Sequence, residues 1–485
     1  MTIEEMCQKY DYKNVLHYFC EISEVPRGSG HNEKISAYLA EFAKEHGISY
    51  VQDESLNIIM YKPASEGYEA HTPVIIQGHM DMVCVTEPGT AHDFENEPLK
   101  LFVEDGYIGA KGTTLGGDDG IAIAMGMALM ADDTISHPAL EFVITTDEET
   151  GIDGAKNLDA SLLKGKYMLN LDSEEEGTVL AGCAGGLGAE IILPIKKESA
   201  GGHKVCVTVS GLQGGHSGSE INRNRTNAVL LLARYLFEVR ETAEYAVISM
   251  SGGEKSNAIP SFAQAEIVVD SSEREEFKAA TKALLEKYRK ELAVSEPEVS
   301  IQLEEQGEGK YEIMHPTSFE KLLFLLINAP NGVQAMSASL PGLVESSLNL
   351  GIFSAKEESA HFRYSVRSSV GSYKYYIRDR LAYLAEFMGA EFVSGAEYPA
   401  WEYRPDSPLR DLFIRVFRED YGYEPKVEAI HAGLECGLIC EKIPDIDIVS
   451  LGPDMRAIHT PRERLGIESS VRVYRFIEHL LAEMK

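Results

Sequence analysis

Basic residues are scarce in this chain of 485 residues, which has 45 lysines and arginines against 77 aspartates and glutamates and a formal net charge of −32. Such an excess of negative charge argues against contact with a phosphate backbone, so we expect no nucleic acid partner. Long apolar runs are missing as well: no stretch approaches the ~20 apolar residues that span a bilayer, and we expect no membrane partner. The amino terminus lacks a basic segment followed by an apolar one, so no signal peptide is expected.

Cysteines are few and follow no regular spacing. The seven of them are odd in number and scattered over the chain, a pattern typical of reduced thiols rather than of a disulfide framework. Together with the expected lack of a signal peptide, this pattern indicates a cytoplasmic protein. The length of the chain exceeds what one hydrophobic core usually serves, so we expect two or three domains.

The most informative stretch is the apolar run at residues 74–78, which ends at His79 and Asp81. A continuous apolar run predicts a strand that is buried on both faces, and ligands collect at the carboxyl ends of such strands in α/β sheets. Because side chains alternate along a strand, His79 and Asp81 point to the same side. One of them could bind a metal ion while the other orients the imidazole, although a capped turn would also explain the pair.

A second candidate region is the glycine-rich turn at residues 112–120, which contains Asp118 and Asp119. An apolar helix is predicted directly after it, at residues 121–130, so both carboxylates lie near a helix amino terminus, where the helix dipole favours negative charge. Helix N-capping is the alternative, but it needs only one of the two aspartates. Both interpretations stay open at this point.

Two more predicted strands end in acidic residues. Residues 139–146 lead into an Asp-Glu-Glu sequence at 147–149, and residues 167–171 lead into Asp172. Consecutive acids repel each other unless a cation or a proton compensates their charge, whereas a solvated acidic loop is the simpler alternative. Four segments thus place a histidine or an acid at the expected ligand edge. Imidazole nitrogen and carboxylate oxygen together suit Zn²⁺ and its first-row neighbours, whereas Ca²⁺ takes oxygen ligands alone, so the set predicts a metal hydrolase site.

The sequence between residues 187 and 395 differs from the parts on either side. It alternates short strand patterns with helices, which predicts a separate α+β domain inserted into the chain. The tail returns to an α/β pattern and contains His459 in a polar loop. We therefore predict an α/β protein with a discontinuous catalytic domain, built on a mostly parallel sheet flanked by helices, and an inserted α+β lid domain. The predicted bounds are 1–186 and 396–485 for the two parts of the catalytic domain and 187–395 for the lid domain.

Three features stand out in the inserted part. A glycine-dense loop at residues 211–218 carries His216, and a polar turn at residues 256–260 carries Asn257. Arg367 lies in a predicted strand, where a lone arginine is usually a rim charge but could clamp a carboxylate with two hydrogen bonds. For the histidine loop, a structural role is the alternative to a functional one.

Five motifs, in their order along the chain, resemble those of the cocatalytic zinc metallopeptidases, the family that includes carboxypeptidase G, tripeptidase and acetylornithine deacetylase. The motifs are His79-Met80-Asp81, Gly117-Asp118-Asp119-Gly120, Asp147-Glu148-Glu149, Leu171-Asp172-Ser173-Glu174 and Ile458-His459-Thr460. Three further motifs look most like the aminoacyl-histidine dipeptidase branch of this family, and they are Gly214-Gly215-His216-Ser217-Gly218, Ser256-Asn257-Ala258-Ile259-Pro260 and His431-Ala432-Gly433-Leu434-Glu435-Cys436-Gly437. The resemblance covers essentially the whole chain.

The resemblance implies a site with two Zn²⁺ ions per chain, for which Co²⁺ or Mn²⁺ could substitute. Asp118 would bridge the two ions. His79 and Asp172 would complete the ligands of one ion, and Glu149 and His459 those of the other.

The resemblance also implies the groups that carry the chemistry. Glu148 would be the general base, and Asp81 would hold His79 in the tautomer that binds metal. The family often has Asp-x-Lys-Gly where this chain has Asp-Asp-Gly-Ile from Asp118 onward. We assign the bridging role to Asp118 because it takes the family position.

From the inserted part, the resemblance implies that His216 polarises the scissile carbonyl and stabilises its oxyanion. Asn257 and Arg367 would meet the backbone and the terminal carboxylate of the substrate, and Gly433 and Glu435 are expected among the substrate-binding residues. A homodimer through the lid domain is one arrangement that an insert of this length allows.

The implied function is that of a metal-dependent dipeptidase, which hydrolyses the peptide bond of short unblocked peptides, Xaa-His dipeptides included. A water activated by two zinc ions would attack the bond, with a glutamate as the general base. A deacylase of N-acyl amino acids on the same scaffold is one alternative, and a non-catalytic peptide-binding relative is another.

Overall fold

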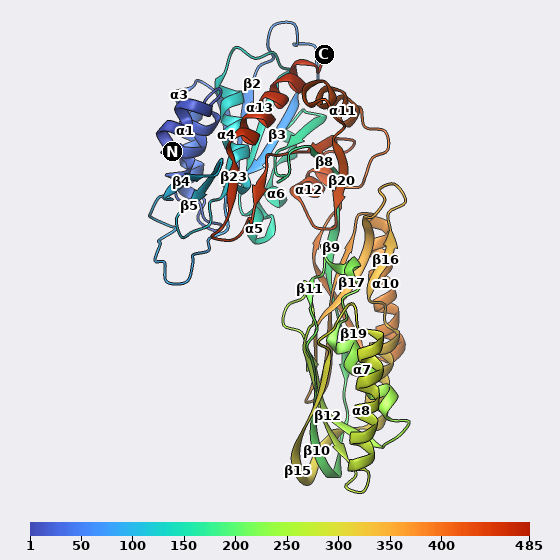
Figure 1. Ribbon diagram of the computed structural model, residues 1–485. Helices are drawn as coiled ribbons and strands as arrows, with labels where there is room; N and C mark the ends of the chain where they lie inside the picture. The colour runs from blue at the N-terminus through green and yellow to red at the C-terminus, as the bar shows by residue number, and fades with distance from the viewer. The chain divides into compact units, whose positions relative to one another are not determined.

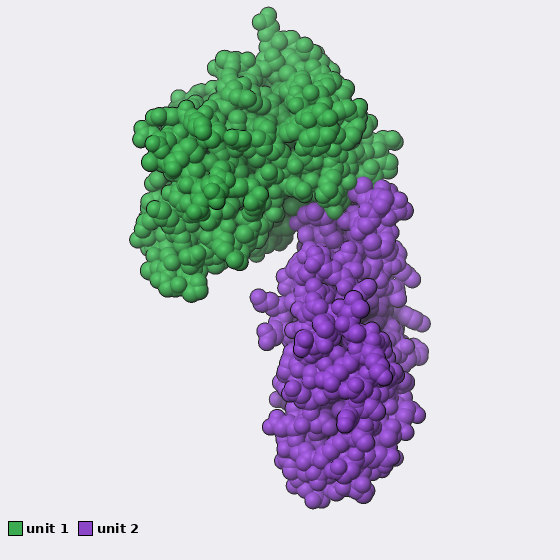
Figure 2. Space-filling model, in the orientation of Figure 1, with its two compact units in different colours: residues 1–182, 403–429, 434–485 green, residues 183–402, 430–433 purple.

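The computed structural model describes residues 1–485 and divides into two compact units (Figure 2). The discontinuous unit consists of residues 1–182, 403–429 and 434–485, and the inserted unit of residues 183–402 and 430–433. Compared with the predicted lid domain, the inserted unit is a few residues longer at both ends and gains a short stretch from the tail. The assignment of the two units as catalytic and lid domains stays a prediction.

The core of the discontinuous unit is an eight-stranded sheet with the strand order β1-β2-β6-β3-β7-β21-β8-β20 (Figure 1). In chain order its strands are β1 (Ser49–Gln52), β2 (Ile58–Lys62), β3 (Val74–His79), β6 (Leu140–Thr145), β7 (Tyr167–Asn170), β8 (Thr178–Cys183), β20 (Lys426–Ile430) and β21 (Asp447–Ser450). The central neighbours β6, β3, β7 and β21 run parallel, whereas β1 pairs with β2, β2 with β6 and β8 with β21 in antiparallel fashion. The predicted parallel sheet is therefore confirmed at its centre and turns antiparallel toward its edges.

Helices flank this sheet, as predicted, and every residue of β3 and β6 is buried. The flanking helices are α2 (Val15–Ser23), α3 (Glu33–Glu45), α4 (Gly117–Ala131), α11 (Pro408–Tyr421) and α13 (Ile467–Ala482). Helix α4 comes very close to β6, because Gly126 faces the ring of Phe142. A Cβ atom at Gly126 would lie 2.0 Å from that ring, so any larger residue here would force Phe142 to move.

A four-stranded sheet joins the tail of the chain to a much earlier segment. Its order is β22-β23-β5-β4, made from β4 (Leu101–Glu104), β5 (Tyr107–Ala110), β22 (Met455–Arg456) and β23 (Arg464–Gly466). Leu465 pairs with Ile108, and the turn between β22 and β23 carries His459. This pairing explains how a residue near the end of the sequence joins a site whose other members come early. The shorter helices of the unit are α1 (Ile3–Tyr10), α5 (Glu148–Gly151), α6 (Asp153–Asn157) and α12 (Glu435–Lys442).

The inserted unit is built on a nine-stranded sheet with the order β15-β10-β14-β12-β17-β18-β9-β19, and β16 pairs with β17. Its strands are β9 (Gly185–Pro194), β10 (Lys197–Ser210), β12 (Tyr245–Gly252), β14 (Ala263–Val269), β15 (Ser300–Met314), β16 (Gly332–Met336), β17 (Val344–Lys356), β18 (Ser359–Ser368) and β19 (Glu391–Tyr398). The paired strands are antiparallel. A separate pair consists of β11 (Gly215–His216) and β13 (Ala258–Ile259).

Helices lie along one face of this long antiparallel sheet (Figure 1). They are α7 (Ala228–Val239), α8 (Arg274–Glu291), α9 (Pro316–Asn328) and α10 (Gly371–Met388). The predicted α+β character of the insert is therefore confirmed. None of the helices in the structure is both long and apolar enough to cross a bilayer.

Candidate metal centre and active site

The carboxylate of Asp118 lies between two histidines. Its Oδ1 is 3.1 Å from Nε2 of His79, and its Oδ2 is 3.1 Å from Nε2 of His459. His79 is the last residue of β3, Asp118 is in the first turn of α4, and His459 is in the turn between β22 and β23. Because each oxygen faces a different imidazole, this carboxylate could bind two cations at once.

Two further acids complete the surroundings of the histidines. Oε1 of Glu149 is 3.0 Å from Nε2 of His459, and Oδ1 of Asp172 is 4.0 Å from Nε2 of His79. Three groups of side chains have ligand atoms within 4.8 Å of one another, and they are His79 with Asp118 and Asp172, Asp118 with Glu149 and His459, and His79 with Glu148 and Glu149. The structure thus brings together all five residues that were predicted as metal ligands.

Burial and neighbouring groups raise the pKa values of several of these residues. Burial raises the pKa of Asp172, and the charges of two neighbouring aspartates raise it further. Burial also raises the pKa of Glu148 to about 8. The pKa of His459 is raised to about 10, because Asp118 and Glu149 accept hydrogen bonds from its imidazole. A buried cluster with this excess of negative groups needs protons or cations as counter-charges, which suits a metal-binding site.

Asp81 is fully buried and lies behind His79. Its Oδ1 is 3.3 Å from Nδ1 of His79, and the other nitrogen of the same ring faces Asp118. The hydroxyl of Ser29 and the backbone N–H of Glu148 donate to the Asp81 carboxylate at 2.7 and 3.1 Å. Although burial by itself raises the pKa of Asp81, the hydrogen bond with His79 lowers it overall. Asp81 is therefore placed to fix the orientation of the imidazole ring.

The structure gives different surroundings to neighbouring acids whose chemistry alone does not distinguish them. Asp119 is fully buried, and its carboxylate accepts the backbone N–H of His79 at 3.2 Å. Asp147 accepts the backbone N–H of Gly30 at 2.6 Å and the side-chain amide of Asn32 at 2.8 Å. Neither aspartate belongs to the three groups around the histidines. Each acidic run thus contains one residue that anchors the backbone or a loop and a neighbour that faces the site.

Glu435 lies at the start of α12 and has no exposed surface. Its Oε2 accepts hydrogen bonds from the amide of Gln77 and the hydroxyl of Thr145, both at 2.6 Å. Gln77 in turn accepts a hydrogen bond from the amide of Asn170 at 2.5 Å. The structure encloses this side chain and bonds it to Gln77 and Thr145, and a role of Glu435 in substrate binding stays a prediction. Burial raises the pKa of Glu435 to about 7.

In the inserted unit, His216 and Asn257 come together at the short strand pair β11 and β13. Nδ1 of His216 accepts the backbone N–H groups of Gly218 at 3.3 Å and Ser219 at 3.2 Å. Because Nδ1 is an acceptor, the proton of the neutral ring is on Nε2. Burial and the charge of a nearby arginine lower the pKa of His216, which keeps the ring neutral. His216 thus presents an N–H donor.

Arg367 lies in β18 within a polar cluster of the inserted unit. Its Nη1 donates to the hydroxyl of Tyr398 at 3.1 Å. Nε2 of His431 is 2.7 Å from the hydroxyl of Ser347, and burial together with the charge of Arg367 lowers the pKa of His431 to about 4. A Cβ atom at Gly433 would lie 2.7 Å from the ring of Tyr398. Arg367 and Gly433 therefore both lie against this tyrosine.

Ser29, Tyr398 and His431 are among the residues of these clusters that were not predicted as site residues. Ser29 stands in a Gly-Ser-Gly sequence, and His431 opens one of the motifs that carry the family resemblance, so both left a signal in the sequence. Tyr398 is one aromatic residue at the end of β19, and nothing near it in the sequence distinguishes it from a packing residue.

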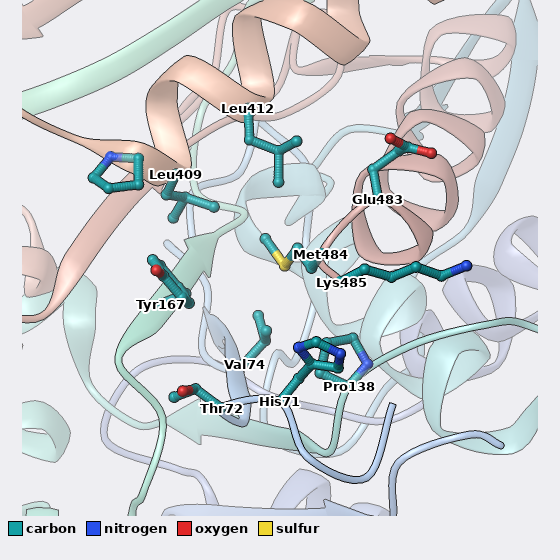
Figure 3. Close-up of a pocket in the computed structure, with 11 residues that line it drawn as sticks. His71, Thr72, Val74, Pro138, Tyr167, Leu409, Leu412, Glu483, Met484 and Lys485 are labelled. Carbon is teal, nitrogen blue, oxygen red and sulfur yellow. The ribbon is translucent and has the colours of Figure 1, made fainter. Parts of the chain in front are cut away.

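A different kind of cavity, open to solvent, lies at the amino ends of the central strands, next to α11 and the last residues of the chain (Figure 3). It has a volume of about 370 Å³. Its lining includes the apolar or aromatic side chains of Val74, Tyr167, Leu409, Leu412 and Met484 and the polar ones of His71, Glu483 and Lys485. None of these residues belongs to the three groups around His79 and His459. The groups that could bind cations are therefore at the carboxyl ends of the strands.

Comparison with known proteins bears on this site. The cytosol non-specific dipeptidase of Escherichia coli (strain K12) is 35% identical to this chain over 468 residues, which cover 96% of either protein. The crystal structure of aminoacylhistidine dipeptidase from Vibrio alginolyticus matches with a TM-score of 0.91 and 32% identity, over 98% of this chain and 97% of that one.

A more distant structure shares the fold. Aminopeptidase PepT from Bacillus cereus matches 98% of this chain and 99% of its own with a TM-score of 0.58, at 17% identity. The model of the family described as Peptidase family M20/M25/M40 matches residues 75–483, a segment that contains both histidines and all the acids of the candidate centre. The predicted family resemblance is confirmed, and the chain belongs to peptidase family M20/M25/M40.

Proposed function

We propose that this chain is a metal-dependent dipeptidase that hydrolyses short unblocked peptides, Xaa-His dipeptides included. The observation that carries the proposal is the carboxylate of Asp118, whose two oxygens each lie 3.1 Å from an imidazole nitrogen, one of His79 and one of His459. The E. coli relative is named a non-specific dipeptidase and the V. alginolyticus protein an aminoacylhistidine dipeptidase, which supports the substrate class.

The donor atoms fit two Zn²⁺ ions. Asp118 would bridge them, with His79 and Asp172 completing the ligands of one ion and Glu149 and His459 those of the other. Imidazole nitrogen and carboxylate oxygen suit Zn²⁺, and Co²⁺ and Mn²⁺ accept similar ligands. When bound, two such cations lower the pKa of a shared water and polarise the scissile carbonyl.

Glu148 is the proposed general base. It takes the proton of the attacking water and passes it to the leaving amine. Glu148 forms a third group of possible ligands with His79 and Glu149. Unlike the other two groups, this one does not contain Asp118, so we assign Glu148 as the base and not as a ligand. In the metal-free protein, burial raises the pKa of Glu148 to about 8, and cations bound beside it would lower this pKa.

Residues of the inserted unit are proposed to bind the substrate. The Nε2–H of His216 would donate to the carbonyl oxygen as negative charge develops on it, and a fixed neutral donor performs this role without reorganisation. Arg367 would pair with the terminal carboxylate, a match that guanidinium geometry favours. Asn257 and Gly433 would meet the peptide backbone.

Asp81 acts in the discontinuous unit by holding His79 in its ligating tautomer.

Location and assembly are part of the proposal. A cytoplasmic location agrees with the name of the E. coli relative. A homodimer through the inserted unit agrees with the exposed apolar side chains on α9 and α10, which are Phe324, Ile327, Tyr376, Tyr383 and Phe387. Sedimentation of the purified protein would establish whether it is a dimer.

Metal analysis together with a panel of dipeptides tests the proposed activity. The purified protein supplied with Zn²⁺ should bind two ions per chain and release free amino acids from several dipeptides, Ala-His among them. A metal-loaded protein that releases no amino acid from any dipeptide would refute the proposal.

The same assay separates the dipeptidase from a deacylase of N-acyl amino acids. A dipeptidase should cleave Ala-His much faster than N-acetyl-His, because its site accepts a free amino group. The opposite preference would replace the dipeptidase assignment by the deacylase one and would leave the metal centre unchanged.

A further inference from the structure

Glu463 is a buried carboxylate, only 2% exposed, that accepts hydrogen bonds from four successive backbone N–H groups. Its Oε2 accepts from Leu115 at 2.8 Å and from Gly116 at 3.0 Å. Its Oε1 accepts from Gly117 at 2.8 Å and from Asp118 at 3.4 Å. These groups open helix α4, whose N-cap residue is a glycine without a side-chain acceptor. The tail of the chain thus supplies the acceptors that the start of the helix lacks.

A tight turn connects Glu463 to His459. The backbone N–H of Glu463 donates to the carbonyl of Thr460 at 3.0 Å, and the hydroxyl of Thr460 donates to the carbonyl of Ala457 at 2.7 Å. His459 has a left-handed backbone, with φ of 60°, and its side chain is 46% exposed. Because nearly half of this side chain is exposed, few neighbouring residues restrain the imidazole. Its position next to Asp118 therefore depends on how the turn is held in place.

A buried arginine holds the opposite side of the same loop. Arg27 donates to the carbonyl oxygens of Gly116 and Met80, the latter at 3.2 Å. The peptide group at Gly116 is therefore fixed from both sides, since its N–H bonds to Glu463 and its carbonyl to Arg27. A Cβ atom at Gly116 would lie 2.5 Å from Nη2 of Arg27, so a side chain at this position would collide with the guanidinium.

We infer that Glu463 is a positioning residue of the metal centre, which holds the Asp118 carboxylate against the His459 imidazole. Glu463 is bonded to the backbone of Asp118 and lies four residues after His459, so it connects the two segments that carry these ligands. The inference rests on the proposed function, because it takes Asp118, Glu149 and His459 as ligands of one cation.

The inference predicts an unequal effect on the two cations. The ion assigned to Asp118, His79 and Asp172 has two ligands at the ends of β3 and β7, and Glu463 bonds to neither of these segments. The ion assigned to Asp118, Glu149 and His459 depends on the turn that Glu463 anchors. Loss of Glu463 should therefore weaken the second of these ions selectively.

The test compares Glu463→Gln with Glu141→Gln. Glu141 is also a buried carboxylate, 4% exposed, and it also accepts backbone N–H groups, those of Lys164 and Gly165 at 2.9 to 3.0 Å. Both proteins and the wild type are loaded with Co²⁺ and dialysed against rising chelator concentrations. Glu463→Gln should lose one of its two ions at roughly 10- to 100-fold less chelator than the wild type, as changes behind a metal ligand do. Glu141→Gln should keep both ions, and excess Co²⁺ should restore the turnover of Glu463→Gln.

The wild-type arm keeps this inference apart from the proposed function. A wild type that holds fewer than two ions or cleaves no dipeptide refutes the proposed function itself. The inference is overturned if the wild type holds two ions, Glu463→Gln holds both equally well, and Glu463→Gln melts as early as Glu141→Gln. That outcome would show that Glu463 is only a helix cap. If Glu463→Gln does not fold, Glu463→Asp takes its place, because it keeps the charge on a shorter side chain, and the same two outcomes apply.

Discussion

The two ends of the central strands bury carboxyl groups in different ways. Near the amino end of β6, Glu141 is balanced by backbone N–H groups, and the cavity at these strand ends is lined by both apolar and polar side chains, none of which belongs to the candidate metal ligands (Figure 3). At the carboxyl ends, several acids share two histidines, and burial raises the pKa values of Glu148 and Asp172. Burial of an acid therefore does not mark a functional site by itself. What indicates a functional site is a cluster of buried acids whose negative charge the protein itself does not balance, so that a cation or a proton must neutralise it.

Removal of the proposed base should have the largest effect on turnover. Glu148→Gln keeps the shape of the side chain but cannot accept a proton, so kcat should fall about 10²- to 10⁴-fold while both metal ions stay bound. Steady-state kinetics and metal analysis on the same sample measure both quantities. The neighbouring Glu149→Gln is the matched comparison, because it should lose a metal ion. Unchanged turnover in Glu148→Gln would assign the base to another residue.

A smaller loss is expected when the group behind His79 changes. Asp81→Ala removes the carboxylate next to Nδ1 of the ring, so kcat/KM or metal affinity should fall roughly 10- to 100-fold. Asp81→Asn should lose less, since its side-chain oxygen can still accept a hydrogen bond from the imidazole. Kinetics, metal content and thermal melting are compared for both variants. A large loss of stability with normal turnover per bound metal would show that Asp81 has a structural role and does not position His79.

A third change should show in the pH dependence of stability rather than in turnover. The pKa of Glu435 is about 7 in the folded protein, against about 4.5 for an ordinary glutamate, so unfolding releases a proton between these values. The metal-free wild type should therefore lose stability as the pH rises from 5 to 8. Glu435→Gln lacks this group and should lose less over the same range, with a difference of roughly 3 kcal/mol. Urea unfolding at both pH values measures it, and parallel losses would contradict the assignment.

A change at the amino ends of the strands should leave turnover untouched. Leu409 is buried at the cavity of Figure 3, and Leu409→Ala should cost about 2 to 5 kcal/mol of unfolding free energy. Its kcat/KM and metal content at 25 °C should equal those of the wild type. Loss of a metal ion in this variant would show that the two ends are coupled and would weaken the contrast between them.

Much of the discontinuous unit could be predicted because its strands are unambiguous. The apolar run at residues 74–78 is β3, the run at 139–146 is β6 and the run at 167–171 is β7, each within a residue or two. Full burial on both faces requires continuous apolar sequence, and this requirement leaves a clear pattern. The positions of the strand ends follow directly from this pattern, so His79 and Asp172 could be named as candidate ligands.

Other features depend on contacts that no local pattern records. Asp147 and Glu148 are neighbours of similar chemistry, yet one anchors a loop and the other faces the histidines. Glu435 shares a motif with Gly433 but points into the core. Glu463 bonds to a helix start nearly 350 residues earlier, and only the folded chain shows that pairing.

The position of His459 has a consequence for the time at which the centre forms. This residue follows Asp172 by 287 residues, and the whole inserted unit is made between them. At the usual rate of translation, about 5 to 20 residues per second, roughly 15 to 60 seconds separate the two proposed ligands. Until the ribosome has added the segment with β22 and β23, the nascent chain has neither His459 nor the turn that carries it. Synthesis of this segment therefore sets the earliest moment at which the proposed second cation could be bound.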